Sequence, residues 1–311
     1  MLPPLKPKTS NTTYGRDAEI ERIRTFIAQM STARHRGSAI LITGEPGVGK
    51  TRLVQSMKRD LRKAGSAILE CVCRPDDDRP NGVFVELFAR GVQHLGDADR
   101  STRPLERTID RLTGLADYTD GGQFDSSDEQ LRLCETVRAA LIEVSSLGMP
   151  AIFIEDLHWA DSATVDVIGY LFDNLLTDPA FDWTPPETEE HLNAANMFHG
   201  LVVTSFRVTE TTRPLVEAAS ATKAIEHIEL SGLDIAGVRE FAQSDAVVAR
   251  LLQATNGNPK RLQQLVDALP ASPDDTLAQT QHVRPPVQTA VLDVLAVVSR
   301  PCTIRQITEL L

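Results

Sequence analysis

The chain of 311 residues is long enough for about two domains of ordinary size. It carries 32 Lys and Arg residues against 43 Asp and Glu residues, which gives a formal net charge of −11. With 41% hydrophobic and 24% charged residues, the composition excludes an intrinsically disordered chain, a collagen-like repeat and a small disulfide-stapled domain. A nucleic-acid-binding surface over the whole chain is also disfavoured, because the acidic excess repels phosphate.

No segment of the sequence has the features of a membrane span or a secretory signal. No apolar run approaches the ~18 residues that a membrane span needs, and residues 1–13 lack an apolar core, so we expect a flexible leader there. Cys71, Cys73, Cys134 and Cys302 are too few and too scattered for a disulfide framework. We therefore expect buried reduced thiols, a cytoplasmic location and no membrane partner.

Helices and strands are expected to alternate along residues 17–230. Apolar residues recur at helical spacing in some segments and form short unbroken runs in others, such as 39–42 (AILI), which are typical of strands covered on both faces. In chain order, we expect a helix at 17–30, a strand at 39–42, a helix at 49–64, a strand at 67–73, helices at 83–95 and 105–115, a helix at 128–147 with Leu131, Cys134, Val137 and Leu141 along one side, a strand at 151–154, a helix at 160–176 and strands at 201–206 and 225–230.

This alternation predicts an α/β fold with βαβ units and a mainly parallel sheet. Residues 177–199 are polar and far exceed the roughly two to six residues that usually join a helix to a strand, so we expect an insertion there. Residues 233–269 have a helical pattern throughout. The expected domains are a leader at 1–13, the α/β domain at 14–231, a helical lid at 232–270, a linker at 271–286 and a truncated winged-helix-like start at 287–311.

Residues 44–51 (GEPGVGKT) match the phosphate-binding loop pattern G-x-x-x-x-G-K-[ST]. Its glycines allow successive backbone N–H groups to converge on phosphate oxygens, and the following helix directs its positive end at them. Lys50 would bring a cation to the β- and γ-phosphates, and the Thr51 hydroxyl would ligate Mg²⁺. The alternative is a glycine-rich turn with an incidental lysine, but a position between a buried strand and a helix favours the phosphate loop.

Residues 151–156 (AIFIED) are four apolar residues that end in two carboxylates, the pattern of a Walker B strand. The carboxyl end of a strand is where a doubly wound sheet binds its ligand. From their positions, we expect Glu155 on the metal side and Asp156 on the side of the attacking water. The alternative is a strand followed by a solvated acidic turn.

Taken together, residues 14–17 (YGRD), the phosphate loop and residues 155–161 (EDLHWAD) resemble the STAND class of AAA-like ATPases. The most similar members are the ATPase modules of large bacterial transcriptional regulators of the LuxR and SARP types. The resemblance covers about residues 12–270, and residues 287–311 resemble the start of the winged-helix domain that follows in this class. It implies a P-loop ATPase with a small helical lid.

The resemblance also implies roles for three residues outside the two motifs. Arg207, after residues 201–206, would read the γ-phosphate at the end of a sensor strand, although a surface arginine is the alternative. Pro259 in residues 255–259 (TNGNP) would pack near the adenine, and Arg16 would lie at the hinge beside the adenine pocket. His158 and Trp159 remain open between packing and catalysis.

The predicted site contains catalytic, nucleotide-binding and metal-binding residues. The predicted catalytic residues are Lys50, Glu155, Asp156 and Arg207. The predicted nucleotide-binding residues are Arg16, Gly44, Glu45, Pro46, Gly47, Val48, Gly49, Lys50, Thr51, Arg52 and Pro259. The predicted Mg²⁺ ligands are Thr51 and Glu155, either of them directly or through water.

The resulting hypothesis is a switch module that binds ATP with Mg²⁺ between the α/β domain and the lid and hydrolyses it slowly to ADP. It implies self-association on nucleotide exchange, effector and sensor domains that are missing from this chain, and DNA contact only through a missing domain. One alternative is a DNA-associated AAA+ ATPase of the origin-recognition or clamp-loader type. The other is a non-hydrolysing scaffold that holds ADP.

Overall fold

The structure is a computed structural model that describes residues 15–32, 37–77, 79, 82–97, 102–118, 126–145, 150–176, 198–240 and 245–267. The expected leader, linker and winged-helix start, and nearly all of the expected insertion, lie outside the described residues. The chain divides into two compact units. The described residues between Ala18 and Pro46 and between Lys50 and Leu230 form the sheet unit. The lid unit consists of residues 15–17, Gly47–Gly49, 231–240 and 245–267.

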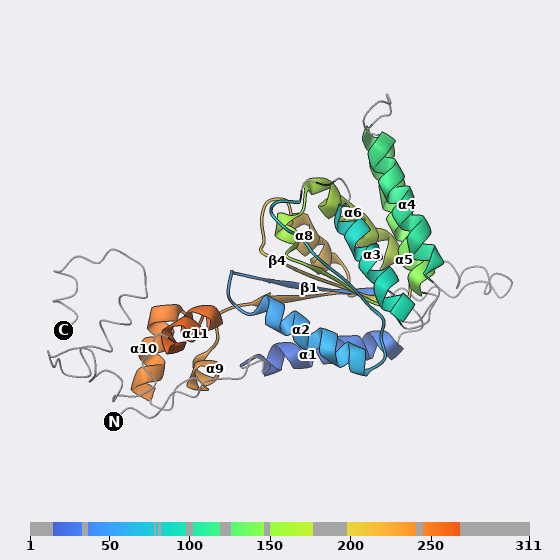
Figure 1. Ribbon diagram of the computed structural model, residues 1–311. Helices are drawn as coiled ribbons and strands as arrows, with labels where there is room; N and C mark the ends of the chain where they lie inside the picture. Colours follow the sequence, from blue (N-terminus) through green and yellow to red (C-terminus); the bar gives the residue numbers. More distant parts are fainter. Residues whose placement is uncertain are drawn as a thin grey trace, which may run out of the picture. The chain divides into compact units, whose positions relative to one another are not determined.

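The sheet unit is built on a five-stranded sheet in which every strand pairing is parallel, with the order β2-β3-β4-β1-β5 (Figure 1). The mainly parallel α/β fold expected from the sequence is therefore confirmed. The strands are β1 (Ser38–Gly44), β2 (Ile68–Val72), β3 (Ala151–Glu155), β4 (Leu201–Phe206) and β5 (Ile225–Leu230).

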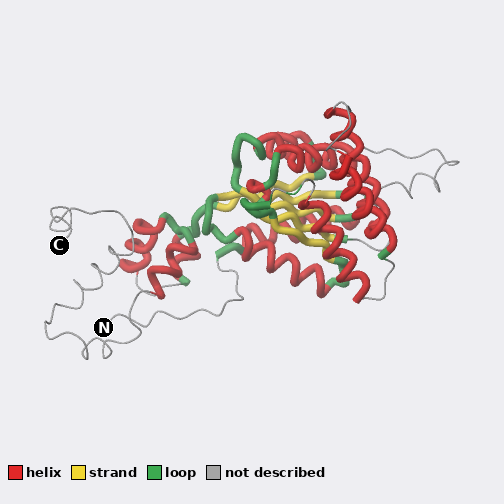
Figure 2. Tube along the Cα trace, turned by 45° about the horizontal axis from the view of Figure 1, so that its top comes forward, coloured by secondary structure: helices red, strands yellow, loops and turns green. Residues whose placement is uncertain are grey.

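Helices cover both faces of this sheet. In Figures 1 and 2, α1 and α2 lie on one side of the strands and α3, α6 and α8 lie on the other. The two faces follow the strand period of two: Ala39 and Leu41 of β1 belong to the core cluster shared with α3, α5 and α6, whereas Ile40 and Ile42 alternate with them. The helices of the sheet unit are α1 (Asp17–Thr32), α2 (Lys50–Lys63), α3 (Gly82–Asp97), α4 (Arg103–Tyr118), α5 (Ser126–Ser145), the 3-10 turn η1 (Leu157–Trp159), α6 (Ser162–Leu175) and α8 (Arg213–Ala221).

The buried side of α5 differs from the expected one at its first position. Leu131 is 53% exposed, whereas Leu133 is buried together with Cys134, Val137 and Leu141. Leu133 lies one position before Cys134 and four before Val137, so it shares their face of the helix. The expected buried side of this helix is therefore wrong at Leu131 and confirmed at Cys134, Val137 and Leu141.

The described residues of the lid unit form the short helices α9 (Ile235–Arg239), α10 (Asp245–Thr255) and α11 (Pro259–Asp267). They enclose a small apolar core of their own. Its buried residues are Leu233, Val238, Val248, Leu251, Leu262 and Leu265. This separate core explains why these helices group apart from the sheet unit.

Three cysteines are described, and Cys71, Cys73 and Cys134 are all buried free thiols. Burial raises the pKa of the Cys73 thiol to about 12 and that of Cys71 well above its usual range, so both thiols are neutral at pH 7.

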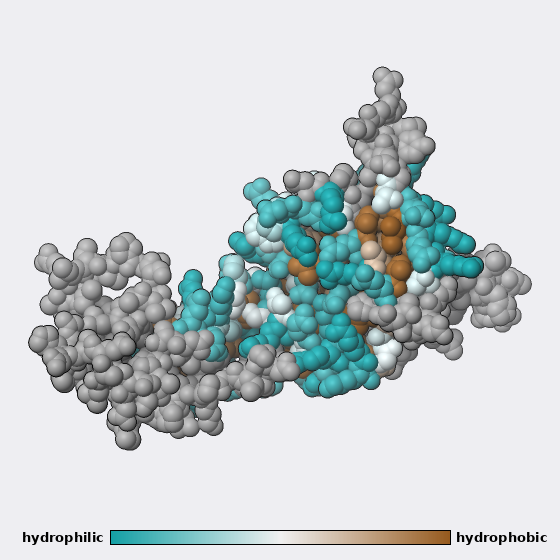
Figure 3. All heavy atoms as spheres, viewed as in Figure 1, coloured by the Kyte–Doolittle hydropathy of each residue, from teal (hydrophilic) through white to brown (hydrophobic). Residues whose placement is uncertain are grey.

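The surface of the described residues seen in Figure 3 is mostly hydrophilic, as expected for a chain with 24% charged residues. Hydrophilic residues cover most of the described face in Figure 3, with apolar side chains gathered where α3 and α4 lie together. Across the described part of the chain, no helix combines the length and the hydropathy that crossing a membrane requires.

The start of α6 provides a test of local stability. The Asp161 carboxylate accepts a hydrogen bond of 2.6 Å from the Thr164 N–H and so caps the helix. We expect Asp161→Ala to lower the free energy of unfolding by about 1 kcal/mol in urea denaturation. Asp166 is exposed on the same helix, and Asp166→Ala should change that free energy by less than about 0.5 kcal/mol. Equal losses in the two variants would contradict a capping role for Asp161.

Candidate nucleotide-binding site

The loop at residues 44–51 joins the carboxyl end of β1 to the first turn of α2. Gly44, Gly47 and Gly49 have φ values of 145°, 84° and 107°, which side chains with a Cβ rarely adopt. A Cβ at Gly49 would meet no atom within 4 Å, so the backbone conformation rather than crowding requires glycine there. The glycines of the sequence pattern therefore occupy the loop positions whose backbone conformation requires glycine.

Lys50 is the first residue of α2 and is 9% exposed. Its Nζ donates hydrogen bonds to the carbonyl oxygens of Gly44, at 2.6 Å, and Glu45, at 3.2 Å. Burial lowers the pKa of Lys50, and the nearby Arg207 adds to this, whereas the Asp156 and Glu45 carboxylates oppose it. The ammonium thus has loop carbonyls as its partners and a carboxylate and a guanidinium as charged neighbours.

Asp156 directly follows β3 and is half-buried. Its backbone lies in the left-handed region, with φ 56° and ψ 37°, where non-glycine residues are uncommon. The Asp156 N–H donates to the Ser205 hydroxyl of β4 at 3.4 Å. An unusual backbone conformation next to Lys50 is typical of a functional position.

Arg207 directly follows β4, the strand between β1 and β3. Its backbone N–H donates to His158 Nδ1 at 3.5 Å, and the His158 ring stacks at a tilt on Trp159 with centroids 4.9 Å apart. Burial lowers the pKa of His158, and Arg207 and Lys50 add to this against Asp156. The imidazole is therefore kept neutral at pH 7. The Arg207 Nε is buried and has no hydrogen-bond partner among the described residues.

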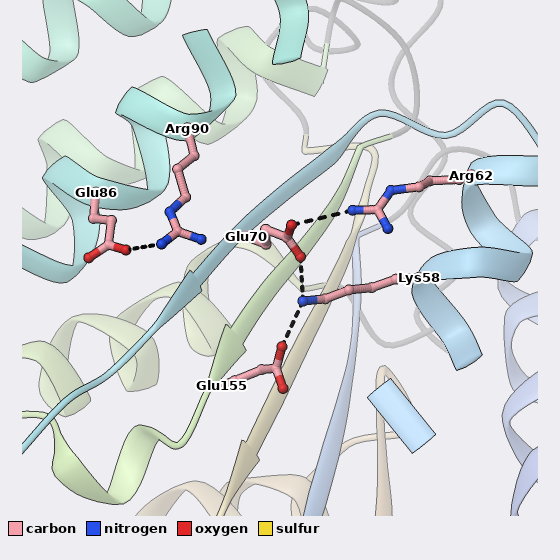
Figure 4. Close-up of polar contacts among 6 residues, drawn as sticks. All are labelled: Lys58, Arg62, Glu70, Glu86, Arg90 and Glu155. Atoms are coloured by element: carbon pink, nitrogen blue, oxygen red, sulfur yellow. Dashed lines mark hydrogen bonds and ion pairs between the residues drawn. The ribbon is translucent and has the colours of Figure 1, made fainter. Parts of the chain in front are cut away.

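Glu155 has a different environment from its neighbour Asp156. It is 4% exposed, and its Oε1 accepts a hydrogen bond of 2.7 Å from Lys58 Nζ of α2. Figure 4 shows the same ammonium reaching Glu70 of β2. The two adjacent carboxylates thus face different cations, Lys58 for Glu155 and Lys50 for Asp156.

Within the lid unit, Arg16 is 5% exposed and reaches the tip of the phosphate loop. Its guanidinium donates to the Val48 carbonyl at 3.0 Å and to the Ser231 carbonyl. The Lys260 N–H donates to the Gly47 carbonyl at 3.2 Å. The loop tip therefore belongs, through its contacts, to the same unit as Arg16 and α11.

Pro259 is the first residue of α11, and Gly257 has a φ of 69° just after α10 ends at Thr255. Gly257 therefore caps the end of α10, and Pro259 takes the first position of α11, where its missing N–H is tolerated. The Asn258 side chain accepts hydrogen bonds from the N–H groups of Lys260, at 3.1 Å, and Arg261, at 3.3 Å. The position of Pro259 is thus fixed by caps on both sides.

The structure brings some of the predicted site residues together and separates others. Lys50, Asp156 and Arg207 are charged neighbours in the sheet unit. Thr51 and Arg52 are exposed at the start of α2, and Glu45 and Pro46 are exposed on the loop before it. Arg16, Gly47–Gly49 and Pro259 lie in the lid unit.

Lys58 is the main residue that the sequence reasoning missed. A signal for it exists, because Lys58 follows Met57 and lies four residues after Val54, so it falls on the buried side of α2. Because an unpaired charge is costly to bury, a lysine on an apolar helix face predicts an acidic partner on the strand that the helix covers.

The residues present fit a nucleotide with its metal ion. The loop has glycines at three positions of positive φ, and Lys50 donates to two loop carbonyls. Among the described residues the buried Arg207 Nε has no acceptor, and a phosphate oxygen would supply one. Across the described residues, no group of three or more His, Cys, Asp and Glu side chains could hold a metal alone. Mg²⁺ on a nucleotide needs few protein ligands because phosphates and water complete its shell, so Thr51 and one carboxylate suffice.

The comparisons with known proteins agree with this geometry. The sequence profile described as "AAA ATPase domain" matches residues 12–180, more than half of the chain. The chain belongs to this AAA ATPase domain family. The AAA-like P-loop ATPase fold that the resemblance implies is therefore confirmed.

Individual relatives are distant. An uncharacterized protein of Rhizobium meliloti is 26% identical over 180 residues, which are 52% of this chain and 18% of that protein. A chain in the structure of the Drosophila ORC bound to DNA aligns with 94% of this AAA ATPase chain at 13% identity and a TM-score of 0.51, and this chain covers 62% of it. Cdc6p from Pyrobaculum aerophilum aligns with 93% at 11% identity and a TM-score of 0.49, with 70% of its own chain covered. At these identities, the Drosophila match shows a shared fold.

The contact between the loop tip and α11 provides a second test. A Cβ on Gly47 would lie 2.8 Å from Asn258 Oδ1, whereas one on Gly65, which has the same φ of 84°, would meet nothing within 4 Å. We expect Gly65→Ala to cost about 1–2 kcal/mol of the free energy of unfolding through backbone strain alone. Gly47→Ala should cost more, because it also displaces Asn258, and it should weaken nucleotide binding in a fluorescence titration. Equal effects of the two substitutions would show that the Asn258 contact is unimportant.

Proposed function

We propose that this chain is an ATP-binding and slowly hydrolysing switch module of a signal-transduction protein that regulates transcription. The observation that carries the proposal is the cluster of Lys50 at the start of α2, Asp156 after β3 and Arg207 after β4. A cation at the start of a helix, a carboxylate and a second cation are the groups that phosphoryl transfer to water requires. Membership of the AAA ATPase domain family supports the same chemistry.

Each group has a task in hydrolysis of the β–γ bond of ATP. Lys50 exchanges its loop carbonyls for oxygens of the β- and γ-phosphates. Asp156 accepts a hydrogen bond from the attacking water and orients it toward the γ-phosphorus. Arg207 donates to the γ-phosphate and stabilises the charge that develops as the bond breaks, and ADP and phosphate are released.

Thr51 and Glu155 would hold Mg²⁺, which when bound would supply positive charge to the phosphates. The adenosine end is assigned to Arg16 and Pro259, both in the unit that contains the loop tip. Arg16 is already fixed there by its hydrogen bonds to Val48 and Ser231.

The signalling role rests on the resemblance of residues 155–161 to STAND ATPase modules. It is supported by the match to only 18% of the much longer Rhizobium meliloti protein, since switch modules of this class lie within long chains. In this proposal ADP and ATP forms differ in self-association, and effector domains beyond this sequence read the difference. DNA contact would belong to such a domain, because this chain carries a net charge of −11.

A DNA-associated ATPase is the second candidate, and the fold shared with the Drosophila ORC chain favours it. Fluorescence anisotropy with labelled duplex DNA separates the two candidates. ATP-dependent binding of DNA by this chain at physiological salt would favour the second candidate over the switch module.

Substitution of the loop lysine tests nucleotide binding. Lys50→Ala removes the cation that faces the phosphates, and we expect it to weaken ATP affinity by an order of magnitude or more in isothermal calorimetry. Lys63, exposed at the far end of the same helix, provides the control, and Lys63→Ala should leave the affinity unchanged. An unchanged affinity of Lys50→Ala would refute the phosphate-loop assignment.

Substitution of the water-side acid tests turnover. Asp156→Asn preserves the shape of the side chain but removes the negative charge, so ATP should still bind while phosphate release falls by about 10²-fold or more. Asp173→Asn, at an exposed position of α6, is the matched control. Normal phosphate release from Asp156→Asn would show that another group activates the water. If the wild type binds ATP and releases no phosphate, the ADP-holding scaffold is the better description.

A further inference from the structure

One lysine is buried between two carboxylates on the face of the sheet that α2 covers. The Lys58 side chain is 2% exposed, and its Nζ lies 2.7 Å from Glu155 Oε1 and forms a second ion pair with Glu70. The ammonium also lies 5.0 Å from the centroid of the Phe153 ring. Figure 4 shows Lys58 reaching from α2 toward β2 and β3, with both carboxylates turned toward it.

The two carboxylates do not depend equally on Lys58. Glu70 is 21% exposed and has a second cation, since its Oε1 lies 3.3 Å from Arg62. The Glu155 side chain is 5% exposed, and Lys58 is the one cation with which it pairs in the described part of the chain. Its other carboxylate oxygen points away from the ammonium in Figure 4. Lys58 therefore can remain paired with Glu70 when Glu155 turns elsewhere.

This cluster lies close to the phosphate end of the proposed site. Lys58 follows Thr51 by seven residues on α2, which places their backbones about 10 Å apart along the helix axis. Glu155 immediately precedes Asp156, the acid that faces Lys50.

We propose that Lys58 is a positioning residue that competes with Mg²⁺ for Glu155, and that Glu70 receives the ammonium when Glu155 turns to the metal's water shell. The inference rests on the proposed ATPase function. A divalent cation attracts the Glu155 carboxylate as the Lys58 ammonium does, so Mg²⁺ and Lys58 compete for the same group. A buried ammonium left without a partner would oppose the change, and Glu70 removes that penalty. The strength of Mg²⁺ binding is thus set by the balance between the two carboxylates.

The test measures the Mg²⁺ concentration that gives half-maximal binding of a fluorescent ATP analogue. Lys58→Met removes the competitor and should lower this midpoint by about three- to tenfold. Glu70→Gln removes the alternative partner, strengthens the hold of Lys58 on Glu155, and should raise the midpoint by a similar factor. If Lys58 had a merely structural role, both substitutions would weaken Mg²⁺-dependent binding and raise the midpoint. That result would overturn the proposal.

Two controls tie the effect to Glu155. In the Glu155→Gln background, neither Lys58→Met nor Glu70→Gln should move the midpoint, because the carboxylate for which Mg²⁺ competes is gone. Glu86 forms an ion pair of 2.5 Å with Arg90 on α3, and Glu86→Gln should leave the midpoint at the wild-type value. A midpoint that still shifts in the Glu155→Gln background would overturn the assignment.

Binding of the ATP analogue by the wild type tests the proposed function, and the shifts of the midpoint test the role of Lys58. If the wild type does not bind the ATP analogue, the ATPase proposal fails and this inference fails with it. If the wild type binds and the midpoints do not move, only the inference fails. Should circular dichroism show that Lys58→Met is unfolded, the rise in midpoint for Glu70→Gln and its loss in the Glu155→Gln background decide the matter.

Discussion

Parallel pairing of β3, β4 and β1 is the constraint on which the candidate site depends. The register aligns Glu155 of β3 with Ser205 of β4, and Thr43 of β1 with Phe206 of β4. The three strands therefore end at the same edge of the sheet, and the residues that follow them emerge side by side. A phosphate loop, an acidic pair and an arginine that are far apart in the sequence become neighbours for this reason.

The two acids at the end of β3 show how strongly position within a strand controls chemistry. Glu155 is the last residue of the strand, so its side chain follows the strand alternation onto the face that α2 covers. Asp156 is past the strand, and its left-handed backbone releases it from that alternation. Neighbouring carboxylates therefore belong to separate charge networks, one centred on Lys58 and the other on Lys50.

Helix α2 connects these networks because it carries both lysines. Lys50 begins the helix at the loop, and Lys58 lies on its buried face against the sheet. The partners of Lys50 are loop carbonyls, and those of Lys58 are carboxylates of β2 and β3. A single helix therefore carries one cation to the loop and another to the sheet.

Much of the architecture was predictable because it depends on local periodicity. Unbroken apolar runs identified the strands, with β4 and β5 at their observed bounds, and the loop pattern located the start of α2. The bounds of α5 and its buried side were less predictable. Leu131 and Leu133 both fit an amphipathic helix, and only packing against the rest of the core decides which one is buried.

The sequence by itself determined the α/β class, the phosphate loop and the acidic pair, because each is written in residues that are adjacent along the chain. The separation of Glu155 from Asp156 and the pairing of Lys58 with Glu70 were decided by the tertiary structure alone. These features require strands β2 and β3 to lie beside each other under α2, and sequence spacing carries no information about which ends of distant segments meet. A buried charge selects its partner from whatever the fold brings within reach, since leaving it unpaired in the core is too costly.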